Sequence, residues 1–165
     1  MLQDSYNSEA GAEAGAEAAA SDRLRSEWIG LLARAPLGLL EGWSGALGAT
    51  SYTWLRRPEQ GLVMLQGRAG GAGERFNLGE MTVTRCTLRL ASGACGVAYV
   101  QGRSPRRAEL AALADALLQQ PATADSVRRE LIAPLATHLQ AQAGRAQRKA
   151  QGTKVDFFTV AHGDD

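Results

Sequence analysis

Cysteine and histidine are scarce in this sequence of 165 residues, which contains two of each. Cys86 and Cys95 form no Cys-x-x-Cys pair, and His138 and His162 are far apart in the chain. A structural zinc site needs about four such ligands, and an iron–sulfur cluster needs about three or four thiolates. We therefore expect no metal-ligating and no catalytic residue in this chain, and no cofactor bound by the chain alone.

An excess of charge of either sign is also absent, because 18 Lys and Arg balance 17 Asp and Glu. A nucleic-acid binder that relies on phosphate contacts needs a basic surplus, so no nucleic-acid partner is expected. The longest uncharged runs, 42–55 and 131–144, are shorter than the roughly 20 apolar residues of a membrane span. With no basic and apolar leader at its start, the sequence predicts a cytoplasmic protein without a membrane anchor.

The first 20 residues lack basic residues and have no large apolar residue after Tyr6. Their acidic residues and two copies of Gly-Ala-Glu-Ala form a low-complexity stretch. Such a stretch cannot bury enough surface to offset its ordering entropy, although its alanines allow transient helix. We expect a disordered acidic tail over 1–20 and one folded domain over 21–165.

Apolar residues at helical spacing predict helices on both sides of a central β region. Ser21 and Ser104 are candidate N-caps, and Pro105 fits the first helical position after Ser104. Prolines end or break the helices. The expected ranges are 21–35, 37–47, 104–120 and 124–150, the last with a break at Pro134.

The middle of the chain is rich in β-forming residues. Strands at 50–56 and 62–68 flank a turn containing Pro and Gly, which predicts a first hairpin. Strands at 80–91 and 94–102 flank Ser92-Gly93, which predicts a second hairpin. A final strand is expected over 155–160. The sum predicts an α+β domain with an antiparallel sheet of about four to five strands, flanked by N-terminal and C-terminal helices.

A two-residue turn at Ser92-Gly93 sets Leu90 opposite Cys95 and Cys86 opposite Tyr99, with all four on one apolar face. Both cysteines are then core thiols, about 13 Å apart and too distant for a disulfide. Reduced thiols agree with a cytoplasmic location. The opposite face carries Arg85 and suits a surface covered by a helix of the same chain or by another subunit.

The most unusual segment is the glycine-rich stretch 68–76. Backbone amides freed by its three glycines can converge on an anion, with Arg68 and Arg75 as flanking cations. The stretch lacks the Gly-Lys-Ser/Thr of a phosphate loop and the strand-to-helix crossing of a dinucleotide site. It is a candidate for phosphate or partner binding, and a plain connecting loop is the alternative.

A second candidate is the run Gln101-Gly102-Arg103, which leads into the helix expected after Ser104. Helix N-termini favour anions, yet Arg103, Arg106 and Arg107 crowd this one. A bound phosphate or a partner carboxylate would relieve that conflict. The alternative is a set of solvated arginines screened by salt, with Glu109 as a nearby partner.

Five motifs stand in order along the chain: Gly-Gly-Ala-Gly-Glu-Arg-Phe at 70–76, Gly-Glu-Met-Thr-Val-Thr-Arg at 79–85, Val-Gln-Gly-Arg at 100–103, Ala-Glu at 108–109 and Val-Asp-Phe-Phe-Thr at 155–159. In order and spacing they resemble PhnG, the G-subunit family of the bacterial carbon–phosphorus lyase system. The resemblance covers roughly residues 24–163. Two positions depart from the family pattern: Arg107 replaces a histidine before Ala-Glu, and Lys154 replaces an arginine before Val-Asp-Phe-Phe.

The resemblance implies a role in using phosphonates as a source of phosphorus. It implies a core complex with H, I and J subunits, acting with L and K components. The G, H, I and L components together displace adenine from MgATP, the substrate, by a phosphonate to give α-D-ribose 1-methylphosphonate 5-triphosphate. The family's I subunit holds the nucleosidase-type centre, and its J subunit cleaves the carbon–phosphorus bond with an iron–sulfur cluster and S-adenosylmethionine. Two cysteines cannot hold such a cluster, so this chain is expected to be a non-catalytic subunit of a multi-subunit transferase.

Within such a complex we expect an assembly subunit. Its glycine-rich segment, arginine-bearing sheet face and apolar C-terminal strand would bind partner subunits and order the I centre. In the alternative, the glycine loop and three arginines hold the triphosphate or phosphonate directly and stabilise the transition state. A stand-alone nucleotide-binding enzyme is the third possibility. The candidate ligand- or partner-binding residues are Arg68, Gly70, Gly71, Gly73, Glu74, Arg75, Arg85, Gln101, Gly102, Arg103, Asp156, Phe157 and Phe158.

Overall fold

The computed structural model describes residues 3–48 and 50–152 and has α+β architecture. Three antiparallel strands form one sheet in the order β1-β2-β3. The expected α+β class is therefore confirmed, but over the described residues the sheet has three strands rather than the four to five predicted. The elements are α1 (Gln3–Leu32), α2 (Leu37–Leu47), β1 (Tyr52–Arg68), the 3-10 turn η1 (Ala69–Gly71), β2 (Arg75–Leu90), β3 (Cys95–Gln101), α3 (Pro105–Leu118), α4 (Pro121–Val127), the π turn η2 (Arg128–Ile132) and α5 (Ala133–Gly152).

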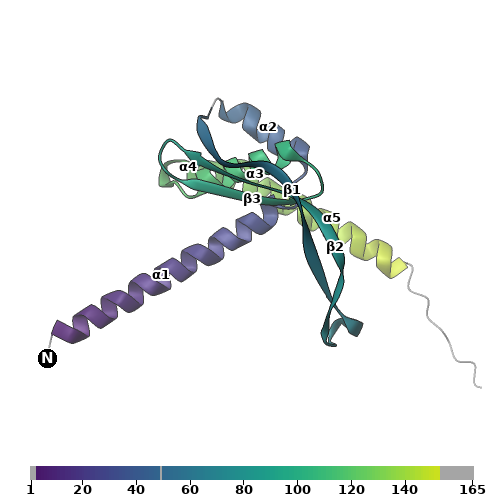
Figure 1. Cartoon of the computed structure of the whole chain (residues 1–165), viewed down its shortest axis with the longest axis horizontal. Helices are drawn as coiled ribbons and strands as arrows, with labels where there is room; N and C mark the ends of the chain where they lie inside the picture. The colour runs from purple at the N-terminus through teal and green to yellow at the C-terminus, as the bar shows by residue number, and fades with distance from the viewer. Residues whose placement is uncertain (1–2, 49, 153–165) are drawn as a thin grey trace, which may run out of the picture.

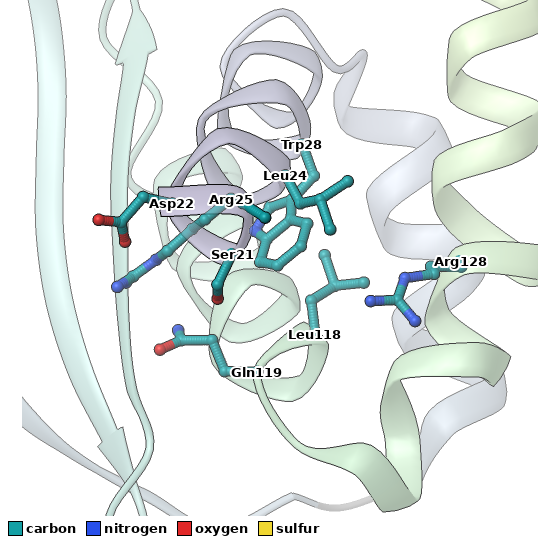
Figure 2. A pocket seen from close by; sticks show the side chains of 9 residues that line it. Ser21, Asp22, Leu24, Arg25, Trp28, Leu118, Gln119 and Arg128 are labelled. Atoms are coloured by element: carbon teal, nitrogen blue, oxygen red, sulfur yellow. The ribbon is translucent and has the colours of Figure 1, made fainter. Parts of the chain in front are cut away.

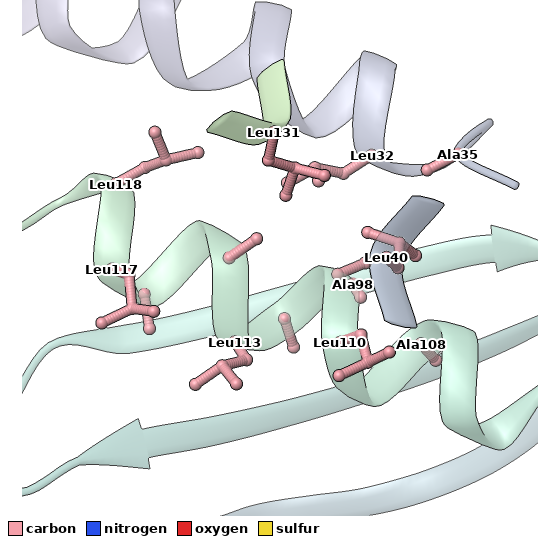
Figure 3. Close-up of a cluster of buried hydrophobic side chains, with 14 of the residues drawn as sticks. Leu32, Ala35, Leu40, Ala98, Ala108, Leu110, Leu113, Leu117, Leu118 and Leu131 are labelled. Carbon is pink, nitrogen blue, oxygen red and sulfur yellow. The ribbon is translucent and has the colours of Figure 1, made fainter. Parts of the chain in front are cut away.

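The core is built around α3, which lies between the sheet and the other helices (Figures 1 and 3). One side of α3 packs on β2 and β3, and the other contacts α1, α2 and α4. Leu32 of α1, Leu40 of α2 and Leu131 of η2 face it across the core cluster (Figure 3). A helix that is apolar on every side is stable only when it is enclosed, so α3 is the centre of the fold.

Small residues on β3 allow α3 to approach the sheet closely. A Cβ atom added to Gly96 would lie 1.9 Å from the carbonyl oxygen of Ala112 and 2.9 Å from the Cβ of Ala116. Neither the backbone of α3 nor that of β3 can give way by that much. Glycine at position 96 is therefore required by the contact between these two elements.

The hairpin between β2 and β3 exists, but its register differs from the prediction by one residue. Leu88 lies opposite Gly96 and Cys86 lies opposite Ala98. The cause is a three-residue turn, Ala91-Ser92-Gly93, in which Gly93 takes a positive φ of 92°. Turns of this length end in a left-handed residue, whereas the predicted two-residue turn would shift every β3 side chain to the other face.

The shifted register separates the two cysteines. Cys86 is buried on the inner face, and this burial raises the pKa of its thiol to about 12. Cys95 is only half-buried, so the prediction that it is a core thiol is wrong. Tyr99, predicted to share the apolar face, is 49% exposed. Both cysteines are free, as predicted.

The first predicted hairpin is not present, because β1 runs without interruption through the expected turn at 57–61. Pro58 is accommodated instead by irregular pairing between Arg56 and Glu59, and Gly61 pairs with Val83 in the regular ladder beyond it. Proline is tolerated there because β1 is an edge strand, with no strand of the described ranges paired to its outer side. The chain reverses at the glycine-rich stretch, so β2 begins at Arg75 rather than at residue 80.

The ends of the helices agree with the predicted ranges to within about three residues, except at the start of α1. α1 begins at Gln3 rather than at Ser21, since the alanine-rich stretch expected to be disordered continues the helix. The limits of the folded domain stay a prediction. The expected break at Pro134 takes the form of the π turn η2 immediately before it. Such turns are common where the regular hydrogen-bond pattern of a helix is interrupted. The strand predicted over 155–160 lies outside the described residues.

Candidate functional site

The sheet narrows to two strands at one end. β3 pairs with β2 only from Val83 to Arg89, whereas β1 and β2 continue to pair as far as Arg68 and Arg75. Residues 62–68 and 75–82 therefore form a two-stranded ribbon, which projects from the helical body and ends in η1 (Figure 1). An isolated two-stranded ribbon is at best marginally stable in water, so this one is expected to gain order from a partner.

One face of the ribbon is apolar. Side chains of cross-strand partners share a face, and the register pairs Val63 with Met81 and Gly67 with Phe76. A Cβ at Gly67 would lie 3.4 Å from Phe76 Cζ and 3.8 Å from Leu78 Cδ1. Phe76 is 47% exposed and Leu78 is 65% exposed. We define the apolar face of the ribbon by these side chains: Val63, Leu65, Phe76, Leu78 and Met81.

The predicted glycine-rich site forms the tip of the ribbon. Gly70 and Gly71 take positive φ angles of 58° and 81°, as the reversal of the chain requires. The amides of Ala72 and Gly73 both donate to the carbonyl oxygen of Ala69. Arg68 donates to the carbonyl oxygen of Gly73 at 3.3 Å. The amides of Ala72 and Gly73 therefore already form hydrogen bonds within the turn. They converge on the carbonyl oxygen of Ala69, an acceptor of the protein itself.

Two cations face each other just below the tip. Arg68 and Arg75 are direct cross-strand partners and both are exposed. Like charges in this position repel each other. Within the described part of the chain neither forms an ion pair, and Glu74 beside them is also exposed. The tip therefore presents positive charge at the end of an apolar face.

The second predicted site is the run Gln101-Gly102-Arg103. The buried side chain of Thr84 fixes the backbone of this run by hydrogen bonds. Its hydroxyl donates to the carbonyl oxygen of Gly102 at 2.7 Å and accepts from the amide of Ser104 at 3.0 Å. Gly102 takes a positive φ of 85°, so glycine is required by the turn before α3. Arg103 is exposed, and none of the ion pairs among the described residues includes it.

The other two arginines at the start of α3 have protein partners. Arg106 forms an ion pair with Glu109 at 2.8 Å, as predicted by the alternative in which Glu109 is a nearby partner of these arginines. Arg107 donates to the carbonyl oxygen of Gln101, but its Nε is buried without an acceptor among the described residues. Arg103, Arg106 and Arg107, which lie within one short stretch of sequence, therefore have three different environments.

The outer face of the sheet carries the third predicted group of residues. Arg85 pairs with Glu59 at 2.7 Å, and Arg56 approaches the same carboxylate at 3.5 Å. Tyr99 and Leu55 on this sheet are about half exposed, at 49% and 48%. The described helices pack on the sheet through α3 on the inner face, so the face with Arg85 is open to a partner.

One buried polar group, Asp115 of α3, is not among the site residues predicted from the sequence. Its carboxylate accepts bonds from Arg25 Nη2 at 2.8 Å, from Trp28 Nε1 at 2.9 Å and from the amide of Val97 at 2.9 Å. The bond to Asp115 raises the pKa of the Arg25 guanidinium. The sequence signal for this buried group is an aspartate within an otherwise apolar helical stripe. Its role is to tie α1, α3 and β3 together.

Beside this buried group lies a cavity of about 510 Å³ between α1 and the end of α3 (Figure 2). Leu24 and Trp28 line one side, and Arg128 lies across from them. Arg25 is engaged by Asp115, and Arg128 pairs with Asp125 at 3.0 Å. Both cations in the cavity therefore already have carboxylate partners.

The remaining predicted site residues, Asp156, Phe157 and Phe158, lie outside the described residues. Over 3–48 and 50–152, no group of three or more His, Cys, Asp or Glu could hold a metal ion. Within the same ranges no helix is long and apolar enough to cross a membrane.

Comparison with known proteins agrees with the motifs. The family described as phosphonate metabolism protein PhnG matches residues 23–163. A curated relative from Rhizobium meliloti (strain 1021), alpha-D-ribose 1-methylphosphonate 5-triphosphate synthase subunit PhnG, is 43% identical over 142 residues. This match covers 86% of the present chain and 90% of the relative. On these two matches, the chain belongs to the PhnG family of phosphonate metabolism proteins.

Proposed function

We propose that this chain is a subunit of an α-D-ribose 1-methylphosphonate 5-triphosphate synthase that acts in phosphonate catabolism. The identity of 43% to a protein named as a subunit of that synthase supports the proposal. In the complex, G, H, I and L components displace adenine from MgATP by a phosphonate, and H, I and J subunits are its core partners. Free Cys86 and Cys95 support a reducing, cytoplasmic location.

Within this complex the chain acts in assembly and in ordering the active centre. The observation that carries this role is the apolar face of the ribbon. Leu78 and Phe76 are exposed on a two-stranded element that is marginal by itself. Contiguous exposed apolar surface of this kind marks protein–protein contact sites. Arg68 and Arg75 make the tip of the ribbon positive. The partner is therefore expected to place acidic groups where it meets this tip.

A catalytic role for the described residues has less support. The neutral form of the Cys86 thiol is favoured by its burial, whereas a nucleophile must be a thiolate. His138 is exposed on α5. Two amides at the glycine-rich tip, those of Ala72 and Gly73, bond to the carbonyl oxygen of Ala69 rather than pointing toward a phosphate. The chemistry of adenine displacement is therefore assigned to a partner, the I subunit.

Co-purification tests the assembly role. The double variant Phe76→Ser/Leu78→Ser is expected to weaken binding to the I subunit by at least about tenfold, because buried apolar anchors dominate interface energies. Leu39→Ser is the matched control, since Leu39 is 36% exposed on α2, away from the ribbon. Circular dichroism confirms that both variants are folded. Equal binding by the double variant and the control would show that the ribbon does not dock the partner.

A further inference from the structure

A cleft of about 420 Å³ opens between the end of α1, the turn before α3 and the middle of α5. Its polar lining consists of two arginines and two glutamines that come from separate parts of the chain. Leu139 supplies part of the apolar wall. The four polar residues are Arg34, Gln101, Arg107 and Gln142.

The two guanidinium groups of the cleft lack a counter-charge. Neither Arg34 nor Arg107 forms an ion pair with any residue in the described ranges. Arg34 uses Nε to donate to the carbonyl oxygen of Gly30 at 2.9 Å, and Arg107 uses Nη2 to donate to that of Gln101. Each guanidinium has five N–H donors, so several remain available. The buried Nε of Arg107 has no acceptor in the described structure.

The surroundings of the cleft strengthen its positive potential. Arg107 is the third residue of α3, where the helix macrodipole is positive. The α5 helix along the other wall carries Arg145, Arg148 and Lys149 and contains no Asp or Glu. The residues lining the cleft also include no carboxylate. A cationic cleft with unused donors and no internal anion is suited to an anionic ligand.

We propose that this cleft binds a tetrahedral phosphorus oxyanion, supplied either by a polyphosphate chain or by a phosphonate. Arg34 and Arg107 supply planar forks that match such oxygens, and the side-chain amides of Gln101 and Gln142 are further donors. Donors from three separate elements suit the three terminal oxygens of this group better than the two of a carboxylate. The site is separate from the glycine-rich tip and does not depend on whether the ribbon docks a partner.

Calorimetry on the full chain at low salt tests the proposal, with inorganic tripolyphosphate and methylphosphonate as probes. One saturable site is expected for at least one probe, and the tighter probe identifies which source of the oxyanion the cleft selects. Arg34→Gln and Arg107→Gln should each weaken binding by about tenfold, because each removes charge-assisted hydrogen bonds. Arg107→Lys should fall between the wild type and Arg107→Gln, because it keeps the charge but loses the fork.

Arg89→Gln is the matched control, since it removes the same charge from an exposed position on the sheet. It should change affinity by less than about twofold, as expected for a distant, screened charge. Circular dichroism checks each variant, and Arg34→Gln decides alone if Arg107→Gln does not fold. The proposal fails if neither probe shows saturable binding, if Arg89→Gln weakens binding as much as Arg34→Gln, or if succinate binds as tightly as the better phosphorus probe.

Discussion

The two ends of the β1–β2 pair differ sharply in their surroundings. At one end, Leu88 and Leu90 are 0% and 5% exposed beneath α3. At the other end, the same strand β2 carries Phe76 and Leu78 at 47% and 65% exposure. Both ends have side chains that favour burial, but only one end has helices of this chain to cover it. The difference shows that the chain covers its own apolar surface at the helical end only, which supports the proposal that a partner covers the ribbon.

This comparison predicts that damage to the helical end destabilises the chain itself, whereas damage to the ribbon affects only assembly. Substitutions at the helical end should therefore lower the free energy of unfolding of the isolated chain. Substitutions on the apolar face of the ribbon should leave that quantity nearly unchanged. The following predictions test the helical end, beginning with the largest effect.

Asp115→Ala is expected to lower the free energy of unfolding by about 3–4 kcal/mol, the lower part of the range for removing one partner of a buried ion pair, because Arg25 is 33% exposed and can be partly solvated. The substitution leaves Arg25, Trp28 and the amide of Val97 without their acceptor. Urea denaturation measures the loss. Asp125→Ala is the control, because its side chain is 86% exposed and its pair with Arg128 should contribute less than about 1 kcal/mol. Similar losses for both variants would contradict the role given to Asp115.

Gly96→Ala is expected to cost about 3 kcal/mol, the upper part of the range for overpacking, because the new Cβ meets the backbone of α3. Thermal unfolding measures this effect. Gly42→Ala in α2 is the control, since a Cβ there meets nothing within 4 Å. The control should stabilise the chain by up to about 1 kcal/mol through higher helix propensity. An unchanged melting temperature for Gly96→Ala would mean that α3 and β3 are not in close contact.

Alkaline pH tests the inner face through Cys86. Its pKa is about 12 in the folded chain and 9.0 as a free thiol, so above pH 9 the unfolded state binds fewer protons than the folded state. Stability present below pH 9 should then fall with rising pH by up to about 1.4 kcal/mol per pH unit from this group. Tyr52, whose pKa is raised to about 12, adds to the fall above pH 10. Urea denaturation from pH 8 to 11 measures it, and Cys86→Ala should show a shallower slope. Equal slopes for the two proteins would contradict the burial of the thiol.

The helices were largely predictable from the sequence, because their signals are local. Apolar spacing and the Ser104-Pro105 start placed α3 correctly. Turn length was less predictable: a two-residue and a three-residue turn around Gly93 differ in one backbone conformation, yet they place opposite faces of β3 against the core. Pro58 is typical of a turn in sequence, but an irregular edge strand accommodates proline equally well.

The candidate sites show the same limit. Gly70, Gly71 and Gly102 were predicted as binding residues, and the structure gives all three positive φ values that shape the turns in which they lie. The ribbon could not be predicted, because an exposed apolar strand has the same side-chain alternation as a buried one. The cleft at Arg34 and Arg107 was also hidden, since its residues come from elements far apart in the sequence.

Hydrogen–deuterium exchange with and without the I subunit tests the central claim most directly. We expect amides of the ribbon, residues 62–68 and 75–82, to exchange rapidly in the free chain and to become protected when the I subunit is bound. Amides of α3 should exchange slowly in both states, because this helix is enclosed by the chain's own elements. Ribbon amides that are equally unprotected in the complex, or protection that appears only on α3, would contradict the claim that the ribbon is the docking element.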